Sequence, residues 1–377
     1  MKYNKFRFDE ITLNYDKKRI PLSAMERTKR QGAFRYFGAQ GVIDYVDDYI
    51  FDGKYLLIAE DGENLKSKRQ NIAQIVEGKF WVNNHAHIVQ CNDKCILEYL
   101  AYLINGKDVS GYITGSAQPK LSQANLNAME FDIPSIKEQQ DILSILLPIE
   151  QKIRINKEIN NNLEQQAQAI FANEFLSLDT LPEGWKQASL IDIADYLNGL
   201  AMQKYRPTAD ESGIPVLKIK ELRQGCCDDN SELCSPSIKS DYIIHDGDVI
   251  FSWSGSLLVD LWCGGICGLN QHLFKVTSSK YDKWFYYAWT KHHLDRFVAV
   301  AADKATTMGH IKRDELAKAE VLIPNEADYN RIGALLQPIY EMIISNRIEN
   351  KKLVATRDTL LPKLMNGEID MSEVDYE

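Results

Sequence analysis

The chain has 377 residues, a formal net charge of −9, 45% hydrophobic residues and 26% charged residues. This length allows about two or three domains, and the composition is that of a globular protein. No apolar run approaches the roughly 20 residues of a membrane span, and the N-terminus lacks the apolar segment of a secretory signal. The seven scattered cysteines are typical of reduced thiols, so we expect a cytoplasmic protein. The acidic balance excludes a broadly basic surface and leaves local patches for any binding of nucleic acid.

Residues 1–134, the first body, predict a mixed α/β domain. The runs KYLLIAE (residues 54–60) and AHIVQC (residues 86–91) have the β-branched and apolar content of strands. CILEYLAYLI (residues 95–104) has the apolar spacing of a helix.

Residues 135–178 predict a helical region with a seven-residue pattern. Its regularly spaced positions are Ile142, Ile149, Asn156, Leu163 and Ile170. Ile145 and Ile159 follow two of them by three residues, which is the a and d spacing of a coiled-coil seam. Asn156 either lies buried in that seam, where it would specify the register, or faces solvent where the seam is imperfect.

Pro148 lies inside this helical pattern. Proline fits the first turn of a helix and breaks its interior. We therefore expect a short helix over about residues 137–147, followed by a long helix that starts or kinks at Pro148 and reaches Phe175.

Residues 179–324, the second body, repeat the order of the first. They open with LPEGW (residues 181–185) and contain strand-like DVIFSWSG (residues 248–255) and LNQHLFKV (residues 269–276). The aromatic run of residues 284–297 predicts a helix.

Residues 325–377 predict a second helical region with the same seven-residue pattern. Its regularly spaced positions are Ile332, Ile339, Asn346, Leu353 and Leu360, with Leu335 and Met342 between them. A shift of 190 residues carries Pro148 onto Pro338 and Asn156 onto Asn346 without a gap. The chain therefore contains two copies of one unit, each a body followed by a helical arm.

Several motifs, taken together in this order, resemble the specificity subunits of type I restriction–modification systems. They are IPSIKEQQDILSIL, KEINNNLEQQAQAIFANEF, LPEGW, GDVIFSWSGSL, GLNQHLFKV, ATTMGHIKRDEL and LLPKLMNGEID. The first body departs from the pattern, because it lacks the Pro-x-Gly-Trp start and has IAEDGENL where the second has FSWSGSL.

The resemblance implies a mixed α/β fold with two target recognition domains, residues 1–134 and 179–324. These would be separated by two helical regions, residues 135–178 and 325–377, that form an antiparallel coiled coil with an internal pseudo-twofold repeat. Each domain would read half of a bipartite site on double-stranded DNA, and the helices would set the spacer and dock the modification subunits. The chain itself would be non-catalytic and hold no cofactor. S-adenosylmethionine would bind to the modification subunits, of which two are implied, and restriction subunits are further partners that the family allows.

DNA contacts require cations for phosphates and amides or cations for base edges. Both bodies offer such residues in loop-like stretches near aromatic side chains, which we treat as candidates while noting that single surface charges are commonly only solvated. In the first body the candidates are Lys17, Lys18, Arg19, Arg27, Lys29, Arg30, Arg35, Tyr36, Lys66, Lys68, Arg69, Gln118 and Lys120. In the second they are Lys218 and Lys220 on one expected strand face, Arg223, Ser252, Trp253, Ser254, Lys304, Thr306 and Thr307.

Other chemistries are less favoured. His85, His87, Cys91 and Cys95 include zinc-ligand types, but they lack a tight Cys-x2-Cys turn, so strand and core packing is the preferred interpretation and no metal is expected. The chain has no P-loop, no nucleophile elbow and no adjacent prolines of an amino-methyltransferase. The alternative to a DNA reader is a coiled-coil scaffold whose bodies bind protein, which the acidic total charge would suit.

Overall fold

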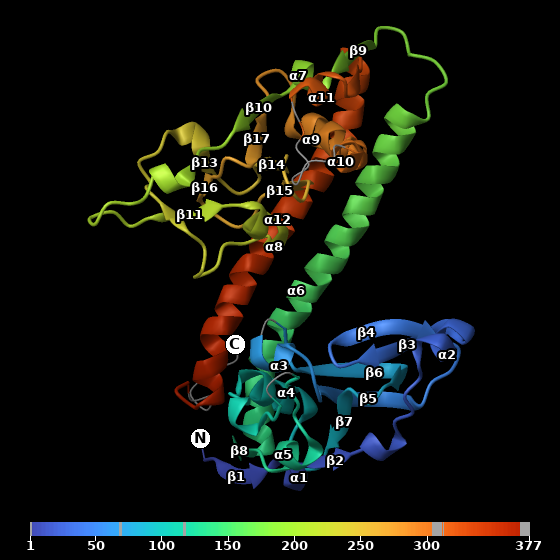
Figure 1. Ribbon diagram of the computed structural model, residues 1–377, viewed down its shortest axis with the longest axis vertical. Helices are drawn as coiled ribbons and strands as arrows, with labels where there is room; N and C mark the ends of the chain where they lie inside the picture. The colour runs from blue at the N-terminus through green and yellow to red at the C-terminus, as the bar shows by residue number, and fades with distance from the viewer. Residues whose placement is uncertain (1, 68–69, 116–117, 304–310, 312, 370–377) are drawn as a thin grey trace. The chain divides into compact units, whose positions relative to one another are not determined.

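A computed structural model describes residues 2–67, 70–115, 118–303, 311 and 313–369 (Figure 1). The chain divides into two compact units. Unit 1 contains Met1–Glu150 and Thr356–Glu377, and unit 2 contains Gln151–Ala355. Each unit holds one mixed α/β body together with parts of two long helices, which confirms the predicted fold class. The predicted domain limits at residues 134, 178 and 324 follow a different division and stay predictions.

A six-stranded sheet forms the centre of unit 1. Its strands, in spatial order, are β2 (Thr12–Asn14), β7 (Ala86–Cys91), β5 (Phe51–Ala59), β6 (Ala73–Val82), β3 (Gln31–Gly38) and β4 (Gly41–Val46). Only β3 and β6 run parallel among these pairs. Helix α4 (Leu97–Gly106) contributes Tyr99 and Leu100 to the same hydrophobic core as Leu56 and Ile58 of β5. The expected strands and helix of the first body are thus present.

Shorter elements complete the first body. They are β1 (Asn4–Arg7), α1 (Phe8–Ile11), η1 (Asp16–Lys18), α2 (Ala24–Lys29), α3 (Asn64–Ser67), η2 (Ser110–Tyr112), α5 (Gln123–Asn127) and β8 (Glu130–Ile133). Strands β1 and β8 form a separate two-stranded antiparallel sheet.

Two four-stranded sheets and one two-stranded sheet build the second body. The first four-stranded sheet contains, in spatial order, β10 (Asp195–Asn198), β17 (Leu273–Thr277), β14 (Val249–Ser252) and β15 (Leu258–Leu261). The second four-stranded sheet contains β12 (Leu233–Cys234), β11 (Ile214–Leu217), β16 (Cys267–Leu269) and β13 (Ile243–Ile244). The two-stranded sheet pairs β18 (Glu320–Ile323) with β9 (Lys186–Ser189). The expected single strand over residues 269–276 is wrong, because a turn at residues 270–272 separates β16 from β17.

The helices of the second body are short. They are α7 (Leu190–Ile193), η4 (Met202–Lys204), α8 (Ile219–Gln224), η5 (Ser240–Tyr242), α9 (Lys283–His292), α10 (Leu294–Asp303) and α11 (Arg313–Ala317). The aromatic run that predicted one helix forms α9 and α10, which meet at His293. Helix α9 is buried nearly all round and packs Trp284, Phe285 and Trp289 into the core of unit 2.

The repeat is visible in backbone hydrogen bonds. The N–H of Phe8 donates to the carbonyl of Met129 at 2.8 Å, and the N–H of Leu190 donates to that of Ala319 at 3.1 Å. These bonds tie α1 and α7 to the segments just before β8 and β18. The two bodies therefore share this link between their first helix and their last strand, although their sequences and their larger sheets differ.

Each body also begins with an aromatic residue directly before its first strand. Trp185 follows Gly184, whose φ of 78° favours glycine, and its Nε1–H donates to Asp328 at 3.0 Å. In the first body Tyr3 stands at the matching place before β1 and donates its hydroxyl to the carbonyl of Met365 at 3.2 Å. Tyr3 thus stands where the second body has Trp185, but its partner lies at the C-terminal end of α12 whereas that of Trp185 lies at the N-terminal end.

Both long helices pass through their prolines. Helix α6 (Ile136–Phe171) is continuous through Pro148 and ends in a π-helical turn, Ala172–Leu176. Helix α12 (Glu326–Met365) is continuous through Pro338. The expected separate short helix over residues 137–147 is therefore wrong, and packing of buried residues such as Ile142 and Leu146 outweighs the lost backbone hydrogen bond. Among the described residues, no helix is both long enough and apolar enough to cross a membrane.

The two helices pair antiparallel. Within unit 1, Arg357 lies 3.9 Å from Glu150. Within unit 2, Lys152 pairs with Glu349 and Arg331 with Glu174, so residue numbers rise along α6 as they fall along α12. This order confirms the predicted antiparallel pair.

The second buried position of each seven-residue repeat in the coiled-coil seam differs from the expected one. Of the predicted seam residues, Ile142, Asn156, Ile332 and Asn346 are buried, and Ile145, Ile149, Leu163, Ile339 and Leu353 are partly buried. Leu335 and Met342 are 46% and 51% exposed, and Ile159 is 40% exposed. Their neighbours Leu336, Ile343 and Asn160 are buried instead. The placement of Leu335 in the seam is therefore wrong. The second buried position of each seven-residue repeat lies four residues after the first, as Leu336 follows Ile332, and not three residues after it.

Four asparagines form a polar layer in the seam of unit 2. Asn156 Nδ2 donates to Asn350 Oδ1 at 3.0 Å, and Asn346 Nδ2 donates to Asn160 Oδ1 at 2.9 Å. Because a shift of 190 residues carries Asn156 onto Asn346 and Asn160 onto Asn350, these two bonds are repeat-related copies of each other. The layer settles the open question about Asn156, which is fully buried in the seam.

Candidate nucleic-acid interface

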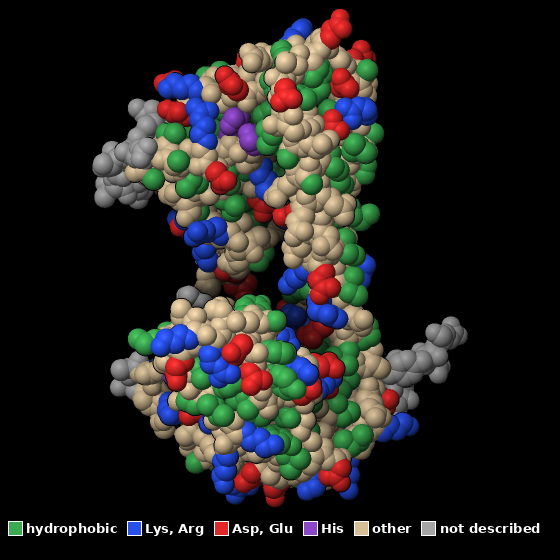
Figure 2. Space-filling view, turned by 90° about the vertical axis from the view of Figure 1, so that its right-hand side faces the viewer, with side chains coloured by type: hydrophobic (Ala, Val, Ile, Leu, Met, Phe, Trp, Pro, Cys, Tyr) green, Lys and Arg blue, Asp and Glu red, His purple; other side chains and the backbone are tan. Residues whose placement is uncertain are grey.

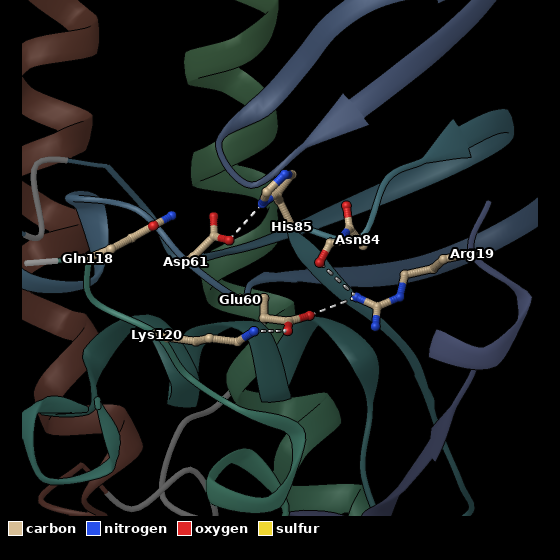
Figure 3. A pocket seen from close by; sticks show the side chains of 7 residues that line it. All are labelled: Arg19, Glu60, Asp61, Asn84, His85, Gln118 and Lys120. Carbon is tan, nitrogen blue, oxygen red and sulfur yellow. Dashed lines mark hydrogen bonds and ion pairs between the residues drawn. The ribbon is translucent and has the colours of Figure 1, made fainter. Parts of the chain in front are cut away.

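An open polar pocket of about 520 Å³ lies at one end of the unit 1 sheet (Figure 3). It is lined by Arg19, Glu60, Asp61, Asn84, His85, Gln118 and Lys120. Glu60 and Asp61 follow the end of β5, and Asn84 and His85 form the turn from β6 to β7. The segment around Lys120 runs beside Glu60, because the N–H of Leu121 donates to the carbonyl of Glu60 at 2.8 Å. Three separate loops thus meet at one sheet edge.

A buried ionic network supports the floor of this pocket. Arg19 Nη1 donates to Glu60 Oε2 at 2.9 Å and to the carbonyl of Ala86 at 2.8 Å. Its Nε donates to the carbonyl of Asp16 at 3.1 Å. Asp16 Oδ2 also lies 2.6 Å from His87 Nδ1, while His87 Nε2 lies 2.9 Å from the carbonyl of Leu121. Arg19 is therefore a structural residue that holds three chain segments together.

The carboxylates of the network are stabilised in their charged form. Burial raises the pKa of Asp16, but the hydrogen bond and charge of His87 and the charge of Arg19 outweigh it and hold the pKa below its usual range. Burial likewise raises the pKa of Glu60, and the hydrogen bond from Arg19 with the charge of His87 lowers it by more. Both groups therefore remain ionised at neutral pH.

The second body carries the same turn at the matching sheet edge. In the first body the N–H of His85 donates to Asn83 Oδ1 at 2.8 Å, and His85 Nδ1 lies 2.6 Å from Asp61 Oδ2. In the second body the N–H of His272 donates to Asn270 Oδ1 at 3.3 Å, and His272 Nδ1 lies 3.1 Å from Ser254 Oγ. The turn is thus built alike in both bodies, although its side-chain partner differs.

Comparison with known proteins identifies the family. Residues 2–165 and 182–354 match the family model described as the type I restriction modification DNA specificity domain. The chain belongs to this family.

Two relatives match most of its length. The MjaIX specificity subunit of a type I restriction enzyme from Methanocaldococcus jannaschii is 28% identical over 311 residues, which cover 75% of this chain and 71% of the relative. The HindI specificity subunit from Haemophilus influenzae is 21% identical over 401 residues, covering 84% of each chain. The crystal structure of a type I S subunit from M. genitalium matches with a TM-score of 0.63 at 12% identity, covering 97% of this chain and 96% of that one. The last similarity concerns the fold alone.

Several residues of the first specificity domain that are predicted to contact DNA form hydrogen bonds within the protein instead. Arg27 donates to Asp44 at 2.9 Å, Arg30 donates to Asp47 at 2.9 Å and Arg35 donates to the carbonyl of Glu77. Tyr36 is fully buried, and its hydroxyl accepts from the N–H of Leu22 at 2.9 Å. The prediction that Tyr36 lies at a DNA surface is therefore wrong, as it is for Arg19.

The exposed candidates of the first specificity domain are fewer. They are Lys17, Lys18, Lys29, Lys66, Gln118 and Lys120. Figure 2 shows Lys and Arg side chains of unit 1 interspersed with Asp and Glu side chains over the face in view. Lys68 and Arg69 lie outside the described residues. The face in view is therefore not a broad basic surface of the kind that phosphate contacts would require.

The second specificity domain corrects other predictions. Lys218 and Lys220 do not share a strand face: Lys218 precedes α8 and Lys220 lies within it. Lys218 pairs with Glu232, and Lys220 pairs with Asp228 at 3.1 Å. Arg223 is exposed at the end of the same helix.

The polar-aromatic turn of the second specificity domain is largely internal. Ser252 is buried and donates to the carbonyl of Ser256 at 2.8 Å, so its predicted DNA contact is wrong. Ser254 is also buried, and Trp253 donates its Nε1–H to Asn198 at 3.0 Å. Lys304, Thr306 and Thr307 lie outside the described residues.

Sequence reasoning missed the turn residues Asn84 and Gln271 as candidates. The signal was present, because the pattern Asn-x-His occurs at residues 83–85 and 270–272, directly before a strand in each body. For His85 and His87 the sequence offers zinc-ligand types but favours strand and core packing, and neither interpretation points to the turn between the strands. His85 contacts Asp61 while His87 contacts Asp16, and the described residues contain no group of three His, Cys, Asp or Glu side chains that could hold a metal.

Proposed function

We propose that this chain is the DNA sequence-recognition subunit of a type I restriction–modification complex. Each specificity domain reads one half of a bipartite site on double-stranded DNA, and the helix pair sets the unread spacer. The observation that carries the proposal is the presence of two specificity domains that share the backbone contacts of one turn and carry different side chains there.

The chain acts by non-covalent binding in this proposal. Modification subunits, two for a chain with two repeats, dock beside the helices α6 and α12 and carry S-adenosylmethionine and the methyl-transfer chemistry. Restriction subunits join the same complex where the system cleaves DNA. In this proposal the chain itself binds no cofactor and acts on DNA in the cytoplasm.

The test is co-expression with the modification subunit of the same system, followed by genome-wide mapping of methylated adenines. We expect one motif made of two defined half-sites separated by a fixed gap. Purified complex should also bind duplexes that contain the motif, with an affinity that falls as salt rises, because phosphate contacts release counterions.

The alternative of a protein-binding scaffold predicts a different outcome. A stable complex that methylates no adenine and binds duplex DNA without sequence preference would favour the scaffold. Methylation of a single continuous motif would instead contradict the division of reading between the two domains.

A further inference from the structure

We propose that the pocket of unit 1 reads an A·T base pair in the half-site of the first specificity domain, through the side-chain amides of Asn84 and Gln118 and the carboxylate of Asp61. This inference rests on the proposed DNA-reading function and goes further, since it names the reading groups and the base. Figure 3 shows these side chains around one opening. Gln118 is directed toward Asp61, and Asp61 contacts His85.

The charges of the pocket argue against a phosphate ligand. Arg19 already contacts Glu60 and Asp16, and Lys120 Nζ lies 3.2 Å from Glu60 Oε1. Each of these two cations therefore has a carboxylate partner, and Asp61 adds a further negative charge at the opening. A phosphate would be repelled by the carboxylates and would have to displace an ion pair.

The same pairing argues against guanine. Guanine offers two acceptors, N7 and O6, in the major groove, and the side chains that match them best are unpaired arginine or lysine. Here the two cations are engaged, and the Asp61 carboxylate would face an acceptor. Guanine at this position would therefore be disfavoured.

The groups that remain free match adenine. Asn84 and Gln118 are exposed, and neither side-chain amide has a hydrogen bond to another described residue. An amide donates and accepts together, so it pairs with N7 and the N6 amino group of adenine. Alternatively, Asp61, whose Oδ2 faces His85, accepts the single N6–H that a paired adenine turns to the major groove, and the amides then donate to N7 and to O4 of the paired thymine.

The second specificity domain provides an internal comparison. At the matching turn it has Gln271 in place of Asn84, Ser254 in place of Asp61 and Trp253 in place of Glu60. The backbone contacts are kept, since the N–H of Glu60 and that of Trp253 donate to the carbonyls of His85 and His272. A common scaffold with exchanged side chains is what two readers of unlike half-sites require.

The experiment uses the full chain co-expressed with its modification subunit. Asn84→Ala, Gln118→Ala and Asp61→Asn are compared with wild type by mapping methylated adenines and by methylation of duplexes substituted at each motif position. Gln123→Ala is the matched control, because Gln123 is an exposed glutamine of the same unit outside the pocket.

We expect Asn84→Ala and Gln118→Ala to relax selectivity at an A·T position by tenfold to a hundredfold, in one half-site only. The other half-site and the Gln123→Ala motif should stay as in wild type. The inference is overturned if both alanine variants keep wild-type selectivity at every position, if the relaxed position is G·C, or if methylation falls equally on all sequences. A wild-type complex that reads no bipartite motif would instead remove the proposed function itself.

Discussion

Single residues of this protein show that the identity of a cation says little about its role. Arg19 and Lys17 stand two positions apart in one basic run, yet Arg19 is 14% exposed and paired with two carboxylates while Lys17 is exposed at the surface. An arginine with its planar fork can bridge several acceptors at once, so it is well suited to hold the segments beneath the pocket. The local sequence shows that residue 19 is a cation, but its structural role depends on Glu60, which is distant in the sequence.

His293 gives a residue-scale prediction about pH. It lies at the junction of α9 and α10, is 8% exposed, and its Nε2 donates to the carbonyl of Glu320 at 2.7 Å. Burial lowers the pKa of His293 to about 4, an effect that the charges of His292 and Arg296 strengthen and the bond to Glu320 opposes. Below pH ~6.5 the unfolded chain therefore binds a proton that the folded chain excludes.

We expect unit 2 to lose stability as pH falls from about 6.5 toward 4, by roughly 2 kcal/mol at pH 5, and to be unaffected by this group above pH 7. Urea unfolding followed by tryptophan fluorescence measures this, since five of the six tryptophans belong to unit 2. His293→Gln keeps a donor for Glu320 and should flatten the dependence. An equal pH slope in wild type and variant would refute the assignment.

At the scale of elements, the helix pair shows how packing can outweigh a local rule. Pro148 and Pro338 each remove one backbone hydrogen bond. Both helices nevertheless continue, because the apolar residues along one face of each helix are buried together only when the segment is helical. The asparagine layer has the opposite character, since it adds hydrogen bonds to a seam that apolar residues could fill. Buried asparagines of this kind specify register and reduce stability.

The layer leads to a prediction about stability. Asn346→Leu should lower the free energy of unfolding by about 1–3 kcal/mol, because Asn160 Oδ1 loses its buried donor. Adding Asn160→Leu should recover this loss, because both polar groups are then replaced by apolar ones. Urea unfolding followed by circular dichroism measures both variants.

Asn161→Leu serves as the control, since Asn161 is exposed on the same helix. We expect it to change the free energy of unfolding by less than about 0.5 kcal/mol. A single variant as stable as wild type, or a double variant less stable than either single one, would contradict the proposed role of the layer.

At the scale of the whole molecule, the repeat governs which changes are tolerated. Because α6 and α12 pair antiparallel, a change of length in one helix must be matched in the other. Seven residues inserted between Glu150 and Ile153 require seven more between Asn350 and Arg357, so that the contacts Glu150–Arg357 and Asn350–Ile153 are both kept. An insertion in α6 alone would separate its asparagines from their partners.

We therefore expect the paired insertion to lengthen the spacer of the methylated motif and to leave both half-sites unchanged. A heptad is ~10 Å long at 1.5 Å per residue, which limits the increase to about three base pairs. Mapping of methylated adenines reads out both spacer and half-sites. An altered half-site, or an unchanged spacer in an active complex, would show that the helices do not set the gap.

The sequence by itself determined the repeat, the helical arms, the mixed α/β bodies and the family resemblance. These properties are encoded locally or by ungapped correspondence, as in the seven-residue spacing of Ile142, Ile149 and Asn156, and so they can be read without coordinates. The positions of β5, β7 and α4 were predicted on the same ground.

Only the tertiary structure decided which polar residues are free. Whether Arg35, Tyr36 or Ser252 faces solvent depends on contacts with residues far away in the sequence, and so does the choice between Leu335 and Leu336 in the seam. The pocket likewise exists only because three loops separated by tens of residues meet at one sheet edge. Packing between segments that are distant in the sequence determines which of several chemically similar residues is buried or hydrogen-bonded. The local sequence around these residues therefore does not show which one it is.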